Sequence, residues 1–281
     1  MMYTFLRFPG FKRKAVTLSY DDCPIHDKRL IEIMDKYGLK GTFNISSALL
    51  ECLCKNMPRE EVFSLYADSP HEIAIHGTQH LSLAEVDSAV ATRDIISDRE
   101  QLEKMFGRII KGMAYANGSV SDGAVDIVKN CGIKYARTCV STEQFYIPDD
   151  WLRMPSTCHH ENPRLMELAK RFVEAKEPGY AWANHPLLFY LWGHSFEFNN
   201  NNNWEIIEEF GAYIGNREDI WYATNGEIYD YIQAYNRLEY SVDGSIIHNP
   251  TDKDICLYYF KKNVMIPAMQ TVILDDIKYL L

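Results

Sequence analysis

Two adjacent carboxylates are the first residues in this chain that could support chemistry. Asp21 and Asp22 directly follow an apolar stretch that begins at Lys14 and predicts a buried β-strand. Because consecutive residues of an extended chain point in different directions, the two carboxylates can face one cavity and take different roles. The alternative is structural: Asp22 would cap a helix that begins near His26, and Asp21 would be a solvated loop residue.

Two histidines four residues apart follow another predicted strand, at 72–76. The imidazoles of His76 and His80 can converge on a helical turn or on a loop. Pairs at this spacing are often accidental, and it is their position after a strand of the same predicted sheet as Asp22 that favours a shared site. Two imidazoles and one carboxylate leave coordination positions open, as a catalytic metal requires. The same ligands serve non-haem iron oxygenases, so they do not identify the metal.

A metal ion held in this way suits the hydrolysis of an ester or an amide, because it lowers the pKa of bound water and polarises a carbonyl oxygen. Asp21, next to the ligand but free of the metal, could accept the proton of that water. His194 follows the most hydrophobic stretch, 187–192, and could protonate the leaving nitrogen of an amide. The alternative is a structural histidine bonded to Ser195 or Glu197.

The elements that must position these residues alternate between strand and helix. We expect strands near 14–20, 41–45, 72–76, 111–115, 134–138 and 187–192, and helices near 30–37, 58–66, 82–105, 122–130, 162–175 and 204–213. This alternation predicts parallel strands in an α/β barrel or a doubly wound sheet. Sites in such folds lie at the carboxyl ends of the strands. The polar residues predicted there are Asp21, Asp22, His76, His80, Asn117, Arg137 and His194.

The pattern changes after Leu238. Short strands at 241–247, 255–260 and 271–274 follow one another without helices between them. We therefore predict that residues 1–238 form the barrel and that residues 239–281 form a small antiparallel β appendage packed against it.

The composition narrows the class of partner. The 281 residues carry a formal net charge of -10, which disfavours nucleic acid and anionic membranes and favours a neutral or cationic substrate. No apolar run is long enough to cross a bilayer, and Arg7 and Pro9 interrupt the start before a signal-peptide core forms, so we expect a cytoplasmic protein. The 7 cysteines, with only Cys52 and Cys54 closely spaced, predict reduced thiols.

The motifs resemble those of a known family. Leu-Ser-Tyr-Asp-Asp-Cys at 18–23 and His-Gly-Thr-Gln-His at 76–80 closely resemble the first two motifs of the polysaccharide deacetylases, the carbohydrate esterases with a NodB homology domain. The resemblance covers about 14–238, and includes Lys-Gly-Thr-Phe-Asn at 40–44 and the stretch around His194. It implies a distorted (β/α)7 barrel. The roles that it implies are base for Asp21, acid for His194, and metal ligands for Asp22, His76 and His80.

Three departures from the family pattern affect the expected site. Cys23 replaces a glycine, and Ala-Tyr-Ala-Asn-Gly at 114–118 lacks the arginine of the third motif, so Arg137 and Arg153 are the candidates to orient the base. Gly193 replaces a leucine before the acid histidine. Trp192 is then expected to line the acetyl pocket, and Tyr115 and Asn117 mark the oxyanion-stabilising position. His159 is a candidate for the rim of the substrate site, with a plain loop as the alternative.

The expected function is metal-dependent removal of N-acetyl groups from an acetylated sugar or glycan. Zn2+ is the default metal, and Co2+, Ni2+ and Fe2+ are alternatives. Two other functions stay open: hydrolysis of O-acetyl esters or of another non-peptide C-N bond, and a catalytically silent protein that holds a metal and binds glycans. The oligomeric state is not predicted.

Overall fold

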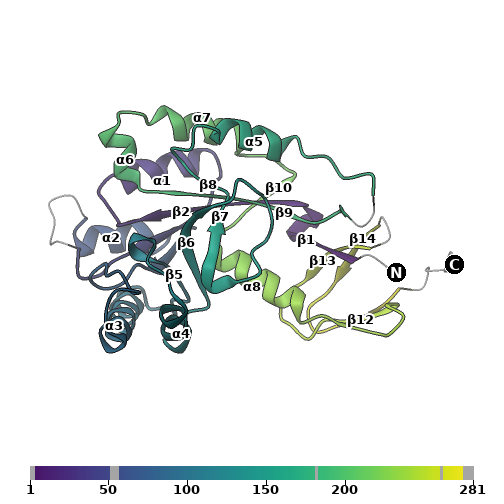
Figure 1. Cartoon of the computed structure of the whole chain (residues 1–281). Helices are drawn as coiled ribbons and strands as arrows, with labels where there is room; N and C mark the ends of the chain where they lie inside the picture. The colour runs from purple at the N-terminus through teal and green to yellow at the C-terminus, as the bar shows by residue number, and fades with distance from the viewer. Residues whose placement is uncertain (1–3, 51–56, 181–182, 260–261, 275–281) are drawn as a thin grey trace.

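The computed structural model describes residues 4–50, 57–180, 183–259 and 262–274 (Figure 1). The cysteine pair Cys52 and Cys54 lies outside these ranges. The strands are β1 Thr4–Arg7, β2 Lys14–Asp21, β3 Gly41–Ile45, β4 Glu72–Ile75, β5 Gly112–Ala114, β6 Tyr135–Ser141, β7 Met154–Ser156, β8 Cys158–His159, β9 Leu187–Gly193, β10 Ile220–Tyr222, β11 Glu239–Tyr240, β12 Ile246–His248, β13 Ile255–Tyr259, β14 Lys262–Ile266 and β15 Thr271–Ile273. The α-helices are α1 Asp27–Lys36, α2 Arg59–Tyr66, α3 Ser88–Phe106, α4 Asp122–Asn130, α5 Leu165–Val173, α6 Ser195–Asn200, α7 Glu205–Ile214 and α8 Asn225–Asn236. Short 3-10 helices are η1 Pro9–Phe11, η2 Ala116–Gly118 and η3 Trp151–Arg153.

The central sheet closes into an irregular barrel. Its strands lie in the order β7-β6-β5-β4-β3-β2-β9-β8, and each neighbouring pair is parallel. β7 and β8 are two pieces of one extended segment, separated only by Thr157, and this segment pairs with β6 at one edge and with β9 at the other. Because both edges meet on the same segment, the barrel has seven strand positions. The predicted distorted (β/α)7 barrel is confirmed.

β2 is the most enclosed strand of the barrel. All of its residues are buried, including the polar residues Thr17 and Ser19 between the apolar ones. β9 pairs with most of its length, β3 pairs with its carboxyl half, and β10 pairs with its amino half. The two carboxylates therefore leave the barrel from a rigid, doubly paired strand.

Helices surround the barrel, with α1, α5, α6 and α7 together on one side and α3 and α4 on another (Figure 1). The helix predictions differ from the structure at three helices. α3 begins at Ser88 and not near 82, because the Asp87 carboxylate caps it there, and 82–87 form turns. The short helix α6, which includes Asn199 and Asn200, was not predicted. α8 was not predicted, although a capping box of Thr224 and Glu227 marks its start.

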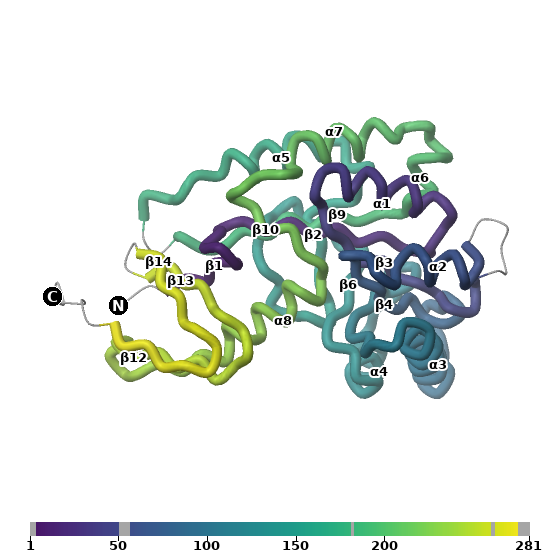
Figure 2. The backbone as a smooth tube through the Cα atoms, turned by 180° about the vertical axis from the view of Figure 1, so that it is seen from behind, coloured from purple at the N-terminus to yellow at the C-terminus, as the bar shows by residue number. Residues whose placement is uncertain are grey.

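Antiparallel C-terminal strands were predicted near β12, β13 and β15, but β11, β14 and a partner at the other end of the chain were not. β1 pairs with β13, which also pairs with β14, and β12 lies between β11 and β15 in a second small sheet. Figure 2 shows the N-terminal strand beside these strands. Leu6, Ile255 and Leu257 share a buried cluster with Tyr231 of α8. The division at residue 238 stays a proposal, because β1 adds to the C-terminal strands.

Candidate metal centre and active site

Three predicted metal ligands converge at the carboxyl ends of β2 and β4. Asp22 Oδ1 lies 3.6 Å from His76 Nε2 and 3.4 Å from His80 Nε2, and one ligand atom from each residue lies within 4.8 Å of the others. Ligands at about 2.0–2.1 Å from a tetrahedral ion are about 3.3 Å apart, so these separations fit a single ion. The residues present therefore suit a divalent metal.

The ring of His76 is oriented for coordination through Nε2. Its Nδ1 lies 2.8 Å from the carbonyl oxygen of Ala114 and donates a hydrogen bond to it, which leaves the Nε2 lone pair facing Asp22. The rings of His76 and His80 meet edge to face, with centroids 4.7 Å apart. Burial lowers the pKa of His76 and so favours the neutral ring that a metal needs.

The backbone at the ligands is strained. Asp22 has φ 75°, Cys23 has φ 51° and His80 has φ 56°, all in the left-handed region that non-glycine residues rarely adopt. Gly77 is also there, at φ 81°, and any side chain on it would collide with a carboxylate of α3. The loop therefore needs outside support.

Helix α3 supplies this support through two carboxylates one helical turn apart. Asp98 accepts the backbone N–H of Ser47 through Oδ1 at 2.8 Å and that of His76 through Oδ2 at 3.1 Å. Asp94 accepts the backbone N–H of Gln79 through Oδ1 at 2.9 Å, while its Oδ2 makes no hydrogen bond among the described residues. Neither role was predicted, because no local pattern distinguishes these acids from solvated helix residues.

Asp21 lies beside the ligand group as a buried carboxylate, only 2% exposed. Arg137 donates to its Oδ2, and Asn44 donates to its Oδ1 at 2.8 Å. Burial alone would raise the pKa of Asp21, but the causes that lower the pKa, first among them the charge of Arg137, outweigh burial. Asp21 is therefore an ionised acceptor at neutral pH.

The structural alternative for the two acids was wrong. Asp21 is buried and not solvated, and the residue at the N-cap of α1 is His26, which makes no side-chain capping bond. Asp22 faces the histidines instead.

Only one of the two candidate arginines reaches Asp21. Arg137 bonds Asp21, whereas Arg153 pairs with Asp150 and Asp122 at the surface. Arg153 was a wrong prediction, because η3 places it outside the barrel while β6 carries Arg137 into the interior.

His194 faces the two acids across the site. Its Nε2 lies 3.9 Å from Asp21 Oδ2 and 4.0 Å from Asp22 Oδ2. Its Nδ1 lies 3.2 Å from Glu197 Oε2, which also accepts the backbone N–H of His194 at 3.0 Å. Burial would lower the pKa of His194, but the negative charges of Glu197 and Asp21 outweigh burial and raise the pKa.

The structural alternative for His194 is thus half right. Glu197 does contact the ring, but Ser195 donates its hydroxyl to Asp27 at 2.6 Å instead. The contact with Glu197 leaves Nε2 facing the acids, so it orients the ring without withdrawing it from the site.

The carboxylate of Glu197 also lies close to two further imidazole rings. Its Oε2 lies 3.1 Å from His159 Nε2 and 3.3 Å from His160 Nε2. His159, His194 and Glu197 have the residue types of a second metal site. The backbone N–H of Glu161, however, donates to His159 Nδ1 at 3.2 Å, which places the proton of a neutral ring on Nε2. The Nε2 proton of His159 thus faces the carboxylate of Glu197, and the side chain of His159 is partly exposed at the edge of the site.

The departure from the family pattern at Gly193 has a steric cause. Any side chain at Gly193 would overlap the ring of His160, so this position cannot carry the usual leucine. The Trp192 ring lies 4.4 Å from the guanidinium carbon of Arg137 and 5.9 Å from the ring of His194. Trp192 therefore lies between the groups proposed as base orienter and acid.

The two residues predicted at the oxyanion-stabilising position differ in their hydrogen-bond partners. The backbone N–H of Tyr115 is taken by the carbonyl of Arg137 at 2.9 Å, and its hydroxyl donates to Leu152, so Tyr115 has no donor left for substrate. Asn117 stands at φ 56° in an exposed turn, with its side-chain amide on Ser82 at 3.0 Å. Its role stays a proposal.

No helix among the described residues has the length and apolar character to cross a bilayer. A family model described as polysaccharide deacetylase matches residues 9–136. No curated protein matches the sequence significantly.

Solved structures show the same fold. A protein of Mycobacterium smegmatis assigned to the polysaccharide deacetylases is 17% identical, with a TM-score of 0.60 over 84% of this chain and 96% of that one. An acetyl xylan esterase of Clostridium thermocellum, in complex with a cobalt ion, is 16% identical, with a TM-score of 0.50 over 77% and 91%. A Bacillus anthracis pseudoenzyme of carbohydrate esterase family 4 is 14% identical, with a TM-score of 0.50 over 80% and 68%.

At these identities the likeness concerns the fold alone. The chain also spans only about half the length of two longer deacetylases that it matches, covering 55% of one from Streptococcus pyogenes and 44% of one from Bacillus cereus. The family model is more specific, since the matched residues 9–136 include both strands that deliver Asp22 and the two histidines. Residues 9–136 thus match the polysaccharide deacetylase family, and the fold of the chain is that of solved polysaccharide deacetylases.

Proposed function

We propose that this protein is a metal-dependent hydrolase that removes N-acetyl groups from an acetylated sugar or glycan. The observation that carries the proposal is the convergence of Asp22, His76 and His80 beside a carboxylate, Asp21, that is held by other partners. A fold shared with a pseudoenzyme is not sufficient evidence of activity. An intact set of ligands, base and acid is the stronger support.

Asp22, His76 and His80 are the residues that would hold the metal. A divalent ion bound there would lower the pKa of a water molecule and polarise the acetamide carbonyl. We propose Zn2+, with Co2+, Ni2+ and Fe2+ as alternatives, because two imidazoles and one carboxylate suit each of these ions.

Asp21 is proposed as the general base. Arg137 and Asn44 each hold one of its oxygens, so the carboxylate has a fixed orientation and stays ionised. It accepts the proton of the attacking water while that water adds to the acetyl carbonyl.

His194 is proposed as the general acid. Its Nε2 faces the acids from the opposite strand end, and Glu197 holds the other ring nitrogen. It gives a proton from Nε2 to the sugar nitrogen as the C-N bond breaks. Trp192 is proposed to line the acetyl pocket, Asn117 to stabilise the oxyanion and His159 to contact substrate at the rim.

Release of acetate tests the proposal. A panel of N-acetylated and O-acetylated sugars is incubated with the protein, with and without a chelator, and with the variant Asp22→Asn. We expect acetate from N-acetylated sugars, lost with chelator and in the variant. Acetate released only from O-acetylated sugars would show that the substrate is an ester and not an amide. Binding of a sugar without release of acetate would indicate a catalytically silent binding protein. A cytoplasmic location, which stays a proposal, favours a small saccharide over a wall polymer.

A further inference from the structure

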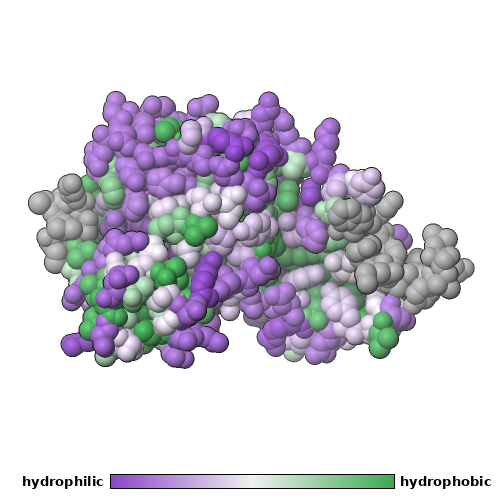
Figure 3. Space-filling view, viewed as in Figure 1, coloured by the Kyte–Doolittle hydropathy of each residue, from purple (hydrophilic) through white to green (hydrophobic). Residues whose placement is uncertain are grey.

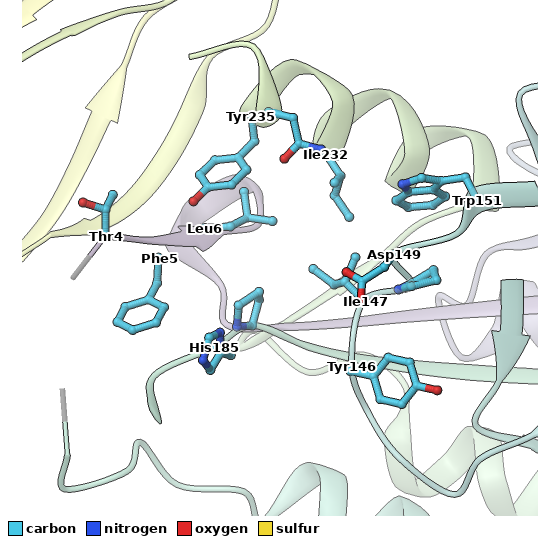
Figure 4. Close-up of a pocket in the computed structure, with 13 residues that line it drawn as sticks. Thr4, Phe5, Leu6, Tyr146, Ile147, Asp149, Trp151, His185, Ile232 and Tyr235 are labelled. Atoms are coloured by element: carbon cyan, nitrogen blue, oxygen red, sulfur yellow. The ribbon is translucent and has the colours of Figure 1, made fainter. Parts of the chain in front are cut away.

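A second cleft lies between the barrel and the C-terminal strands. It encloses about 540 Å³ and is lined by β1, by the loop 146–151, by 185–186 and by the end of α8 (Figure 4). In the space-filling view, a hollow with hydrophobic surface separates the two parts of the molecule (Figure 3). The volume is typical of a site for a small molecule.

This cleft is remote from the metal centre. His185 and Pro186 directly precede β9, which pairs in parallel with β2 from Lys14 onward, so the cleft lies where the barrel strands begin. Asp21 ends β2 at the other side of the barrel, about 23 Å away at 3.3 Å per residue. Any ligand in the cleft is outside the proposed reaction.

Aromatic side chains give the cleft large flat surfaces. Trp151 and Tyr235 stand on different sides of the space, and Phe5 lies beyond Tyr235 (Figure 4). Tyr146 belongs to the same lining and is 52% exposed. Such rings offer apolar faces to the C–H face of a sugar, and their polar tips stay available for hydrogen bonds.

Several polar groups around the cleft make no hydrogen bond with any described residue. Among the described residues, no hydrogen bond is made by the side chains of Asp149, Asn236 and Thr4, by the Tyr235 hydroxyl or by Trp151 Nε1. Donors and acceptors are therefore interleaved with aromatic faces, as hydroxyl-rich ligands require.

The charge of the lining selects against ionic ligands. Among the described residues that line the cleft, Asp149 is the only carboxylate, and none is a lysine or an arginine. A phosphate or carboxylate ligand would find no lysine or arginine there and at most the imidazole of His185, and a purely apolar ligand would leave the polar groups unpaired.

We propose that this cleft is a non-catalytic binding site for a short neutral oligosaccharide. The aromatic faces stack on sugar rings, and Asp149, Asn236 and Tyr235 bond ring hydroxyls. This inference rests on the chemistry of the cleft and does not depend on the proposed deacetylation.

The probe is the trisaccharide of β-1,4-linked N-acetylglucosamine, titrated calorimetrically into the full chain with the Asp22→Asn substitution, which keeps the probe intact. We expect Trp151→Ala and Asp149→Ala each to weaken binding at the cleft at least tenfold. Phe63→Ala, which removes an exposed aromatic of α2 outside the cleft, is the matched control and should leave the affinity unchanged.

Three outcomes overturn the proposal. They are no measurable binding, binding that both cleft variants leave unchanged, and a concentration-dependent dimer that Trp151→Ala abolishes, which would make the cleft an interface between copies of the chain. Asp149 is exposed, so its variant tests the site even if removal of Trp151, which packs on Tyr229, disturbs folding.

Discussion

The guanidinium of Arg137, on β6, donates to Asp21 Oδ2 at the end of β2, and both side chains are buried. The family motif after β5 lacks its arginine in this chain, and the neighbouring strand supplies one instead. Trp192 covers the guanidinium from the barrel interior at 4.4 Å. Asp21, the proposed base, is therefore held from a different strand than the motif implies.

Replacing Arg137 should abolish most turnover. Arg137→Gln leaves a buried carboxylate without its cation, an arrangement that costs about 3–5 kcal/mol and misorients the base. We expect kcat for acetate release to fall at least a hundredfold. Arg153→Gln, the control, should retain turnover within about twofold, because Arg153 bonds surface acids. Normal kcat in Arg137→Gln would show that the base needs no arginine.

Two carboxylates on α3 should differ sharply in their effect on metal affinity. Both oxygens of Asp98 accept backbone N–H groups, one of them from His76, so the amide of Asp98→Asn must face a donor. We expect the Kd for Zn2+ to rise about 10- to 100-fold, as for other groups that orient metal ligands. Competition with a chromophoric chelator measures it.

Asp94→Asn is the matched control for this test. Only Oδ1 of Asp94 accepts a backbone N–H, from Gln79, and Oδ2 makes no hydrogen bond among the described residues, so an amide can take its place. Its Kd should stay within about threefold of the unaltered chain. Equal effects of both variants would mean that α3 supports the loop through its charge and not through directed bonds.

The sequence predicted those parts of the site that depend on strand ends and on motifs. Asp22 and the two histidines lie at the ends of predicted strands, so parallel topology places them at the same edge of the barrel. Arg137 could not be preferred over Arg153, because its contact joins β6 to β2 and leaves no local pattern.

The contact between Glu197 and His194 left a pattern in the sequence, whereas the pairing of β1 with β13 did not. Glu197 stands three residues after His194, the spacing of a capping box, so its contact was recognisable as an alternative but not as support for the acid. The pairing of β1 with β13 joins opposite ends of the chain, and only tertiary packing determines it.

Removing the charge of Glu197 should impair the chemical step more than substrate binding. Glu197 Oε2 contacts the ring and the backbone N–H of His194, so Glu197→Gln loosens the ring that faces Asp21. We expect kcat to fall at least tenfold with KM within about threefold, and Zn2+ content unchanged. His159→Ala, which removes another partner of Glu197, should change kcat less. A change confined to KM would place Glu197 in substrate binding.

Asp27 should make the folded state less stable as the pH rises. It begins α1, is fully buried, and accepts the hydroxyls of Ser195 at 2.6 Å and Tyr66 at 3.0 Å. Burial is the main cause that raises the pKa of Asp27 from 3.8 to about 7. Between these two values the folded chain holds a proton that the unfolded chain has lost, so the free energy of unfolding falls with increasing pH until the folded carboxyl ionises near pH 7.

Urea denaturation at pH 5, 6, 7 and 8, with chelator present so that metal binding does not contribute, measures this effect against Asp27→Asn. The variant leaves one hydroxyl without an acceptor and should be less stable at pH 5, but its stability should depend less on pH. Between pH 5 and 7 the unaltered chain should lose up to about 2.3 kcal/mol more than the variant, at about 1.4 kcal/mol per pH unit near pH 5 and about half of that at pH 7. Because every other carboxyl is common to both proteins, parallel curves would show that Asp27 is ionised throughout this range and that its two hydroxyl donors compensate for burial.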